Sequence, residues 1–189
     1  MGGRIAIGVS AHTGWAALVA LSAELEVVGR QRVQLGDDQT RFVYHVAAEL
    51  PLAKARTLVD KTVQLGRERA REALAKWVAE LGAAPAAMGI VEAKRTLDAE
   101  LETILASHSL IHSAEGALWR EVWATAARGR RMRVHGVPAP ELAPRAAAAL
   151  GLAAARMTGW LAELGKRAGR PWSLDQRQAT LAAAVALRT

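Results

Sequence analysis

The sequence contains no cysteine among its 189 residues. Disulfide bonds, thiolate metal centres and a cysteine nucleophile are therefore excluded. Aromatic residues are also few, with one phenylalanine, one tyrosine and six tryptophans. No apolar run approaches the roughly 18 residues that a membrane-spanning helix needs, and Ser10, His12 and Thr13 interrupt the apolar segment near the start. We therefore expect a cytoplasmic protein without a signal peptide and without a membrane partner.

Acidic residues are outnumbered, with 25 lysines and arginines against 18 aspartates and glutamates and a formal net charge of +7. A basic surface favours anionic partners, of which DNA or RNA is the first to consider. An alanine- and arginine-rich composition produces the same charge without any such partner, so charge alone does not identify one. The length fits a single domain spanning residues 1–189, and a homodimer is one oligomeric state left open.

Short β-branched segments and longer helical patterns follow one another along the chain. Strands are predicted at 4–9, 14–21, 26–35, 88–92 and 132–137. Helices are predicted at 52–81, 114–127, 141–150 and 153–168, with a last one from Ser173 to the end. Tight turns must join the first three strands because they are so closely spaced, which favours an antiparallel meander. The helices near 141–169 form an insertion in this α/β order.

Three local motifs accompany this order of elements. They are I-A-I-G-V-S-A-H-T-G-W at 5–15, G-I-V-E-A at 89–93 and D-Q-R-Q-A-T-L-A-A at 175–183. They resemble the first strand, the strand ending in the catalytic glutamate and the C-terminal helix of the RuvC-type resolvase branch of the ribonuclease H-like superfamily. The motifs S-A-H-T-G and H-S-A-E-G also resemble a group of bacterial proteins to which no activity is attached. The resemblance implies a ribonuclease H-like α/β fold, with the meander followed by alternating helices and parallel strands in a mixed five-stranded sheet.

The resemblance also implies a catalytic centre, from which this sequence departs. Nucleases of this fold hold two Mg²⁺ or Mn²⁺ ions between carboxylates, and the ions clamp the attacking and leaving oxygens of a phosphodiester. Residues 5–15 contain no carboxylate, and the hydroxyl of Ser10 is a weak substitute ligand for such an ion. If hydrolysis survives, Glu92 and Asp175 would bind one Mg²⁺ or Mn²⁺ ion, and His12 would help to position water or phosphate. We therefore expect degraded or absent nuclease activity.

The turn at 8–14 supports a second interpretation. Ser10 and Thr13 are expected at the carboxyl edge of the sheet, where open α/β folds bind ligands, and the flanking glycines allow backbone N–H groups to approach an anion. A related glycine- and threonine-rich loop surrounds nucleotide phosphates in the actin-like ATPases. The simpler alternative is an ordinary hairpin in which Ser10 and Thr13 satisfy nearby backbone groups.

The segment H-S-L-I-H-S-A-E-G places His108, His112 and Glu115 at i, i+4 and i+7. On a continuous helix these residues share one face and have the chemistry of a transition-metal site. Alternatively, His112 and Glu115 line the cleft of Glu92 and contact substrate, or 93–113 is irregular and the residues are structural. On the resemblance, Gly116 is the glycine that lets helix and sheet approach closely.

The densest basic run is Arg128 to Arg133, in which Arg130 and Arg131 are candidates for contact with nucleic-acid phosphates. A solvated loop before an edge strand is the simpler interpretation of the same run. The leading hypothesis is a nucleic-acid-associated protein and, if an enzyme, a metal-dependent nuclease or phosphohydrolase. A phosphate- or nucleotide-binding module and a non-catalytic protein-interaction domain remain the alternatives.

Overall fold

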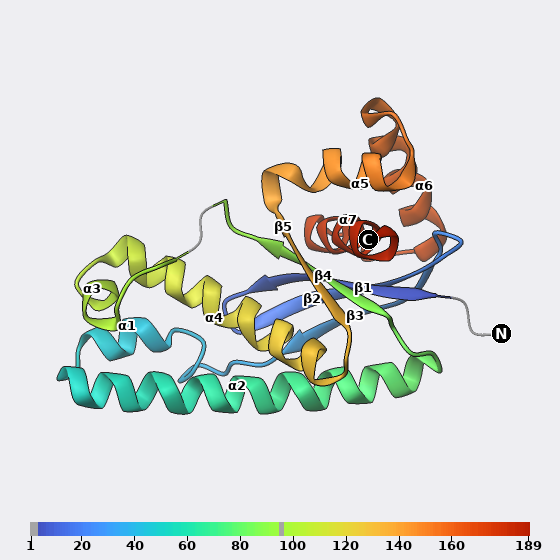
Figure 1. Cartoon of the computed structure of the whole chain (residues 1–189). Helices are drawn as coiled ribbons and strands as arrows, with labels where there is room; N and C mark the ends of the chain where they lie inside the picture. The colour runs from blue at the N-terminus through green and yellow to red at the C-terminus, as the bar shows by residue number, and fades with distance from the viewer. Residues whose placement is uncertain (1–3, 95–96) are drawn as a thin grey trace.

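A mixed five-stranded sheet forms the centre of the molecule in the computed structural model, which describes residues 4–94 and 97–189 (Figure 1). The strands are β1 (Ile5–His12), β2 (Trp15–Ser22), β3 (Val27–Gln34), β4 (Ala87–Glu92) and β5 (Arg133–Pro138). They lie in the order β3-β2-β1-β4-β5. β1, β2 and β3 form an antiparallel meander, while β4 is parallel to β1 and β5 to β4. The expected fold class is confirmed.

Helices cover both faces of the sheet. They are α1 (Val43–Ala48), α2 (Leu52–Leu81), α3 (Leu101–Leu105), α4 (His108–Gly129), α5 (Leu142–Leu150), α6 (Met157–Ala168) and α7 (Leu174–Arg188). α2 and α4 lie on one face, and α7 lies on the other with α5 beyond it (Figure 1). One apolar core forms beneath α2 and α4 and a second beneath α7. In the described residues no helix is long and apolar enough to cross a membrane.

Most expected elements are present with small changes in their ends. α2 has the expected bounds and stops where Gly82 adopts a positive φ of 62°, as glycine favours at a helix C-terminus. The sequence pattern missed α1 and α3, which are too short to show helical periodicity. α4 begins at His108 rather than near 114, so the continuous-helix interpretation of 108–115 is confirmed.

The close contact between helix and sheet depends on Gly8 in β1 and Gly89 in β4. A Cβ on Gly8 would overlap the carbonyl of Ala179 in α7, and a Cβ on Gly89 would overlap the carbonyl of Ala182. The assignment of this role to Gly116 is wrong, because the atoms nearest to an added Cβ there belong to a flexible arginine side chain on the same helix. The glycines of β1 and β4 thus allow α7 to approach the strands closely, whereas the glycine of α4 has no such role.

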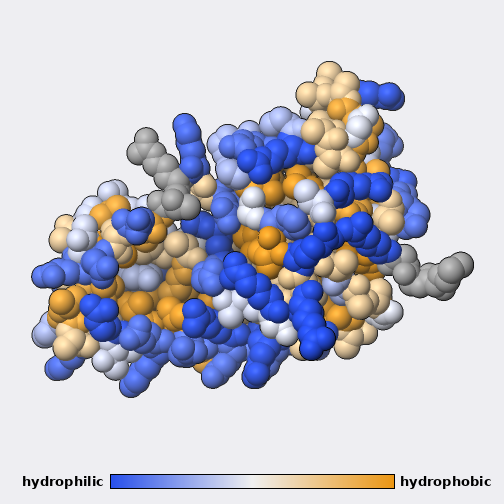
Figure 2. All heavy atoms as spheres, viewed as in Figure 1, coloured by the Kyte–Doolittle hydropathy of each residue, from blue (hydrophilic) through white to orange (hydrophobic). Residues whose placement is uncertain are grey.

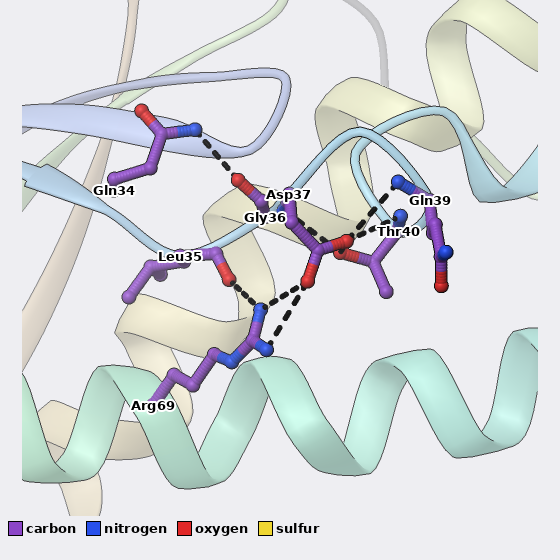
Figure 3. Close-up of polar contacts among 7 residues, drawn as sticks. All are labelled: Gln34, Leu35, Gly36, Asp37, Gln39, Thr40 and Arg69. Carbon is purple, nitrogen blue, oxygen red and sulfur yellow. Dashed lines mark hydrogen bonds and ion pairs between the residues drawn. The ribbon is translucent and has the colours of Figure 1, made fainter.

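An aspartate-centred turn lies between β3 and α1 and is bonded to α2 through Arg69 (Figure 3). Oδ1 of Asp37 accepts the N–H groups of Gln39 and Thr40 at 3.1 and 3.0 Å and the Thr40 hydroxyl at 2.8 Å. Arg69 of α2 donates to Oδ2 of Asp37 at 3.2 Å and to the carbonyl of Leu35 at 2.6 Å. The Thr40 hydroxyl, with help from Arg69, lowers the pKa of Asp37. The turn fixes where the chain enters α1.

Candidate functional site

The turn between β1 and β2 is tied to the end of β3. The two strands stay paired to their last residues, so only Thr13 and Gly14 form the turn. Gly14 adopts a positive φ of 80°, and its carbonyl accepts the N–H groups of Leu35 and Gly36 at 2.8 and 2.7 Å. These contacts fix the turn at the carboxyl edge of β1 and leave Thr13 half-buried there.

The first turns of α7 meet the carboxyl end of β1. The hydroxyl of Ser10 donates to Oε1 of Gln178 at 3.4 Å, and Nε2 of His12 lies 2.8 Å from Oδ1 of Asp175. Ser173 sets the start of α7, because its hydroxyl accepts the N–H of Gln176 in a reciprocal capping box. Three of the predicted site residues, Ser10, His12 and Asp175, therefore lie together.

A stack of flat side chains continues from this contact across the sheet surface. The imidazole of His12 is stacked on the indole of Trp15 at 4.2 Å between ring centroids. The guanidinium of Arg32 in β3 lies over the same indole at 3.7 Å, as cation–π geometry favours. Since the carboxylate of Asp175 can only accept a hydrogen, Nε2 of His12 is the donor in this contact, and in the neutral ring Nδ1 is the acceptor nitrogen. The stack presents a cation, a ring and a proton acceptor side by side.

Glu92 lies on the opposite face of the sheet from this stack. Side chains alternate along a strand, and Ile90, two residues before Glu92, packs into the core beneath α2 and α4. Gly136 of β5 pairs with Ile90, and a Cβ on that glycine would overlap the carboxylate of Glu92. Ser10 instead faces α7 through Gln178. The structure thus does not bring Glu92 and Asp175 to one face.

Glu92 lines a cleft of about 550 Å³ between α4 and the ends of β4 and β5. His112, Arg120 and Arg128 of α4 contribute to the same cleft. Burial lowers the pKa of Arg120, and the negative charge of Glu92 opposes that shift. The cleft therefore combines both signs of charge, and His112 lines it, which is one of the three alternatives left open for this residue.

Glu115 is buried next to α1, with 2% of its surface exposed. Its Oε1 accepts the backbone N–H of Tyr44 at 2.8 Å and lies 3.4 Å from Nδ1 of His45. Burial raises the pKa of Glu115, while these contacts to Tyr44 and His45 act to lower it. Unlike His112, Glu115 is not among the residues that line the Glu92 cleft.

Arg130 and Arg131 lie at the other end of the sheet from Glu92. They form the connection between α4 and β5, and Ala87, at the start of β4, pairs with Arg133. Arg130 lines a separate cavity of about 430 Å³ together with Arg67 and Arg71 of α2. These arginines form a basic surface at the amino edge of the strands, a strand's length from the other candidate residues.

Comparison with solved structures identifies the fold. A structure described as Thermus thermophilus RuvC in complex with a Holliday junction substrate matches with a TM-score of 0.57 and 10% identity. The match covers 96% of this chain and 91% of that one. A second Thermus thermophilus RuvC structure matches with a TM-score of 0.53 and 11% identity, covering 96% and 92% of the two chains. The chain has the ribonuclease H-like fold of RuvC. No family model and no curated protein matches it.

The side chains at the carboxyl edge of β1 are a poor set of ligands for the Mg²⁺ or Mn²⁺ ions of a ribonuclease H-like nuclease. They are the hydroxyl of Ser10, the amide of Gln178, the imidazole of His12 and the carboxylate of Asp175, whose Oδ1 already contacts that imidazole. Hard divalent ions prefer several oxygen ligands, with carboxylates among them. The site is better suited to hydrogen bonding and proton transfer than to holding two metal ions.

Sequence reasoning missed three contributors to these sites. Arg32 and Trp15 stack because β2 and β3 pair in register, which the alternation in β3 alone does not reveal. His45 lies in α1, a helix without a periodic signal, and contacts Glu115 from 70 positions away in the sequence. Arg32 and His45 were marked only by a polar character that is common on any surface, and Trp15 only by its place at the end of the motif at 5–15.

Proposed function

We propose that the protein binds nucleic acid at the carboxyl edge of β1 and does not cut it by two-metal chemistry. The observation that carries this proposal is the replacement of a carboxylate-lined edge by Ser10 bonded to Gln178 and His12 bonded to Asp175. One of the similar RuvC structures contains a Holliday junction, which supports the choice of ligand class. The net charge of +7 supports it as well.

The stack of Arg32, Trp15 and His12 is the surface that we assign to the ligand. Its guanidinium can contact a phosphate, and the imidazole of His12, whose side chain is 40% exposed at the end of the stack, can contact a sugar or base. Arg177, exposed between Asp175 and Gln178 on α7, adds a second cation at the same edge. The hydrophilic residues in Figure 2 extend well beyond this edge, over α2 and around β5, so the test must locate the binding surface.

The test uses pure protein with labelled duplex, single-stranded and four-way-junction DNA, each with and without Mn²⁺ and over a range of salt. We expect binding without product. If the surface meets six or more phosphates, affinity should fall by about 10³-fold or more between 50 and 200 mM salt. Metal-dependent cleavage that Asp175→Asn abolishes would contradict the non-catalytic assignment. No shift at low salt would contradict the binding assignment, and a nucleotide-induced rise in Tm would favour the nucleotide-binding alternative.

Arg32→Gln is expected to weaken nucleic-acid binding and to reduce the salt dependence by about one released counterion. Fluorescence anisotropy titrations at several salt concentrations measure both effects. Arg145→Gln is the matched control, since Arg145 is also exposed but lies on α5, paired with Glu141. Equal losses in the two variants would mean that net charge alone, and not the stack, governs binding.

A further inference from the structure

Three histidines from two helices lie against one another at the end of the molecule where α1 and α4 meet. His45 comes from α1, and His108 and His112 are one turn apart on the first part of α4. Each offers a ring nitrogen, and the three nitrogens lie within 4.8 Å of one another. The ring centroids are 5.6 Å apart for His45 and His108, 4.8 Å for His45 and His112, and 4.5 Å for His108 and His112.

A buried carboxylate stands behind this cluster. Glu115 is 2% exposed, and its Oε1 lies 3.4 Å from Nδ1 of His45. Because a carboxylate only accepts hydrogens, Nδ1 of His45 is the donor in this contact, which leaves Nε2 of the neutral ring as the nitrogen that can bind a metal ion. Among the described residues, Oε2 of Glu115 has no hydrogen-bond partner. A metal-binding histidine usually donates its second ring N–H to a carboxylate in this way, which orients the ring and raises its basicity.

We propose that His45, His108 and His112 bind one divalent transition-metal ion, best matched by Zn²⁺, with Glu115 orienting His45. Imidazole nitrogens suit Zn²⁺ and do not suit Mg²⁺, so this site is distinct from any nuclease-type metal centre. Tetrahedral Zn²⁺ with bonds of about 2.0–2.1 Å places its nitrogen ligands roughly 3.3 Å apart. The exposed side chains of His108 and His112 can close the remaining gap by rotation.

The three histidines leave one coordination position of a tetrahedral ion for water or another ligand. His112 also lines the Glu92 cleft, so the ion would lie at the rim of that cleft. The ion would also link α1 to α4, two elements that are far apart in the sequence. At a free Zn²⁺ concentration 100-fold above the dissociation constant, we expect Tm to rise by about 5–10 °C.

The test is calorimetric titration of Zn²⁺ into tag-free, chelator-treated protein, with Co²⁺ as a spectroscopic substitute. We expect one ion per chain and the visible absorption of tetrahedral Co²⁺. The His108→Ala and His112→Ala variants should each lose more affinity than the roughly 10- to 100-fold expected for Glu115→Gln, which removes only the orienting carboxylate. Both histidines are exposed, so the substitutions should leave the fold intact, as circular dichroism would verify.

The chain provides matched controls, because two of its five histidines lie outside the cluster. His12→Ala and His135→Ala should retain the stoichiometry and affinity for Zn²⁺. The proposal is overturned if binding is not saturable, if it survives the double variant H108A/H112A, or if His12→Ala weakens it as strongly. These results are independent of nucleic-acid binding, which is measured separately without Zn²⁺.

Discussion

Gly8→Ala is expected to lower the free energy of unfolding by about 3 kcal/mol or more, at the upper end of what overpacking costs. The added methyl group would overlap the backbone carbonyl of Ala179 and lie 2.8 Å from the backbone nitrogen of Ala183. Neither atom belongs to a side chain that can rotate away, so α7 must move off the sheet. Gly89→Ala should have a similar effect, through Ala182. Chemical denaturation followed by circular dichroism measures both changes.

Gly159→Ala in α6 is the matched control for these substitutions. Nothing lies within 4 Å of a Cβ at this position, so the variant should be neutral or stabilised by up to about 1 kcal/mol through its higher helix propensity. A Gly8→Ala variant as stable as this control would mean that α7 does not lie on β1. The contact between His12 and Asp175 would then lose its structural basis as well.

The sequence was sufficient to predict the sheet and most helices because their signals are local. β-Branched runs mark β1 and β4, the long apolar stripe marks α2, and Ser173 followed by Asp175 marks the start of α7. Such patterns arise from the residues within one element. The resemblance then implied that the later strands join the meander as parallel strands of one mixed sheet, which no local pattern contains, and the structure supplies the order β3-β2-β1-β4-β5.

The candidate site was harder to predict because it depends on faces, edges and long-range pairs. A site shared by Glu92 and Asp175 requires both side chains to lie on the same face of the sheet. Ile90 packs beneath α2 and α4, and because side chains alternate along a strand, Glu92 lies on that face too, whereas Asp175 lies on the face covered by α7. Arg130 precedes a strand parallel to β4, so it belongs to the amino edge of the sheet, whereas Glu92 ends its strand at the carboxyl edge. The contact of His45 with Glu115 depends on tertiary packing alone.

Introducing two carboxylates at the carboxyl edge of β1 is expected to make the stability of the protein depend on a bound metal ion. Ser10 is 3% exposed and its hydroxyl contacts Gln178, one helical turn from Asp175. In the double variant S10D/Q178D, two added charges would lie beside an existing carboxylate with little solvent. The free energy of unfolding should fall by about 3–5 kcal/mol, as for other uncompensated buried charges. Millimolar Mn²⁺ should restore part of the lost Tm, because a divalent cation neutralises neighbouring carboxylates.

The control S10N/Q178N has the same shapes as that variant without the charges, so it should lose less stability and show no response to Mn²⁺. With the histidine cluster removed by H108A/H112A in every variant, the natural edge should respond equally little, since Asp175 already contacts His12 at 2.8 Å and Glu92 faces away. A rise of Tm with Mn²⁺ that persists in the H108A/H112A variant, which lacks the histidine cluster, would show that the natural edge still binds metal, contrary to the proposed function. A double-aspartate variant that Mn²⁺ does not rescue would show that the geometry of this edge differs from a metal site in more than its side chains. In that case the likeness to RuvC ends at the fold, and the pairing of His12 with Asp175 is the chemistry to pursue.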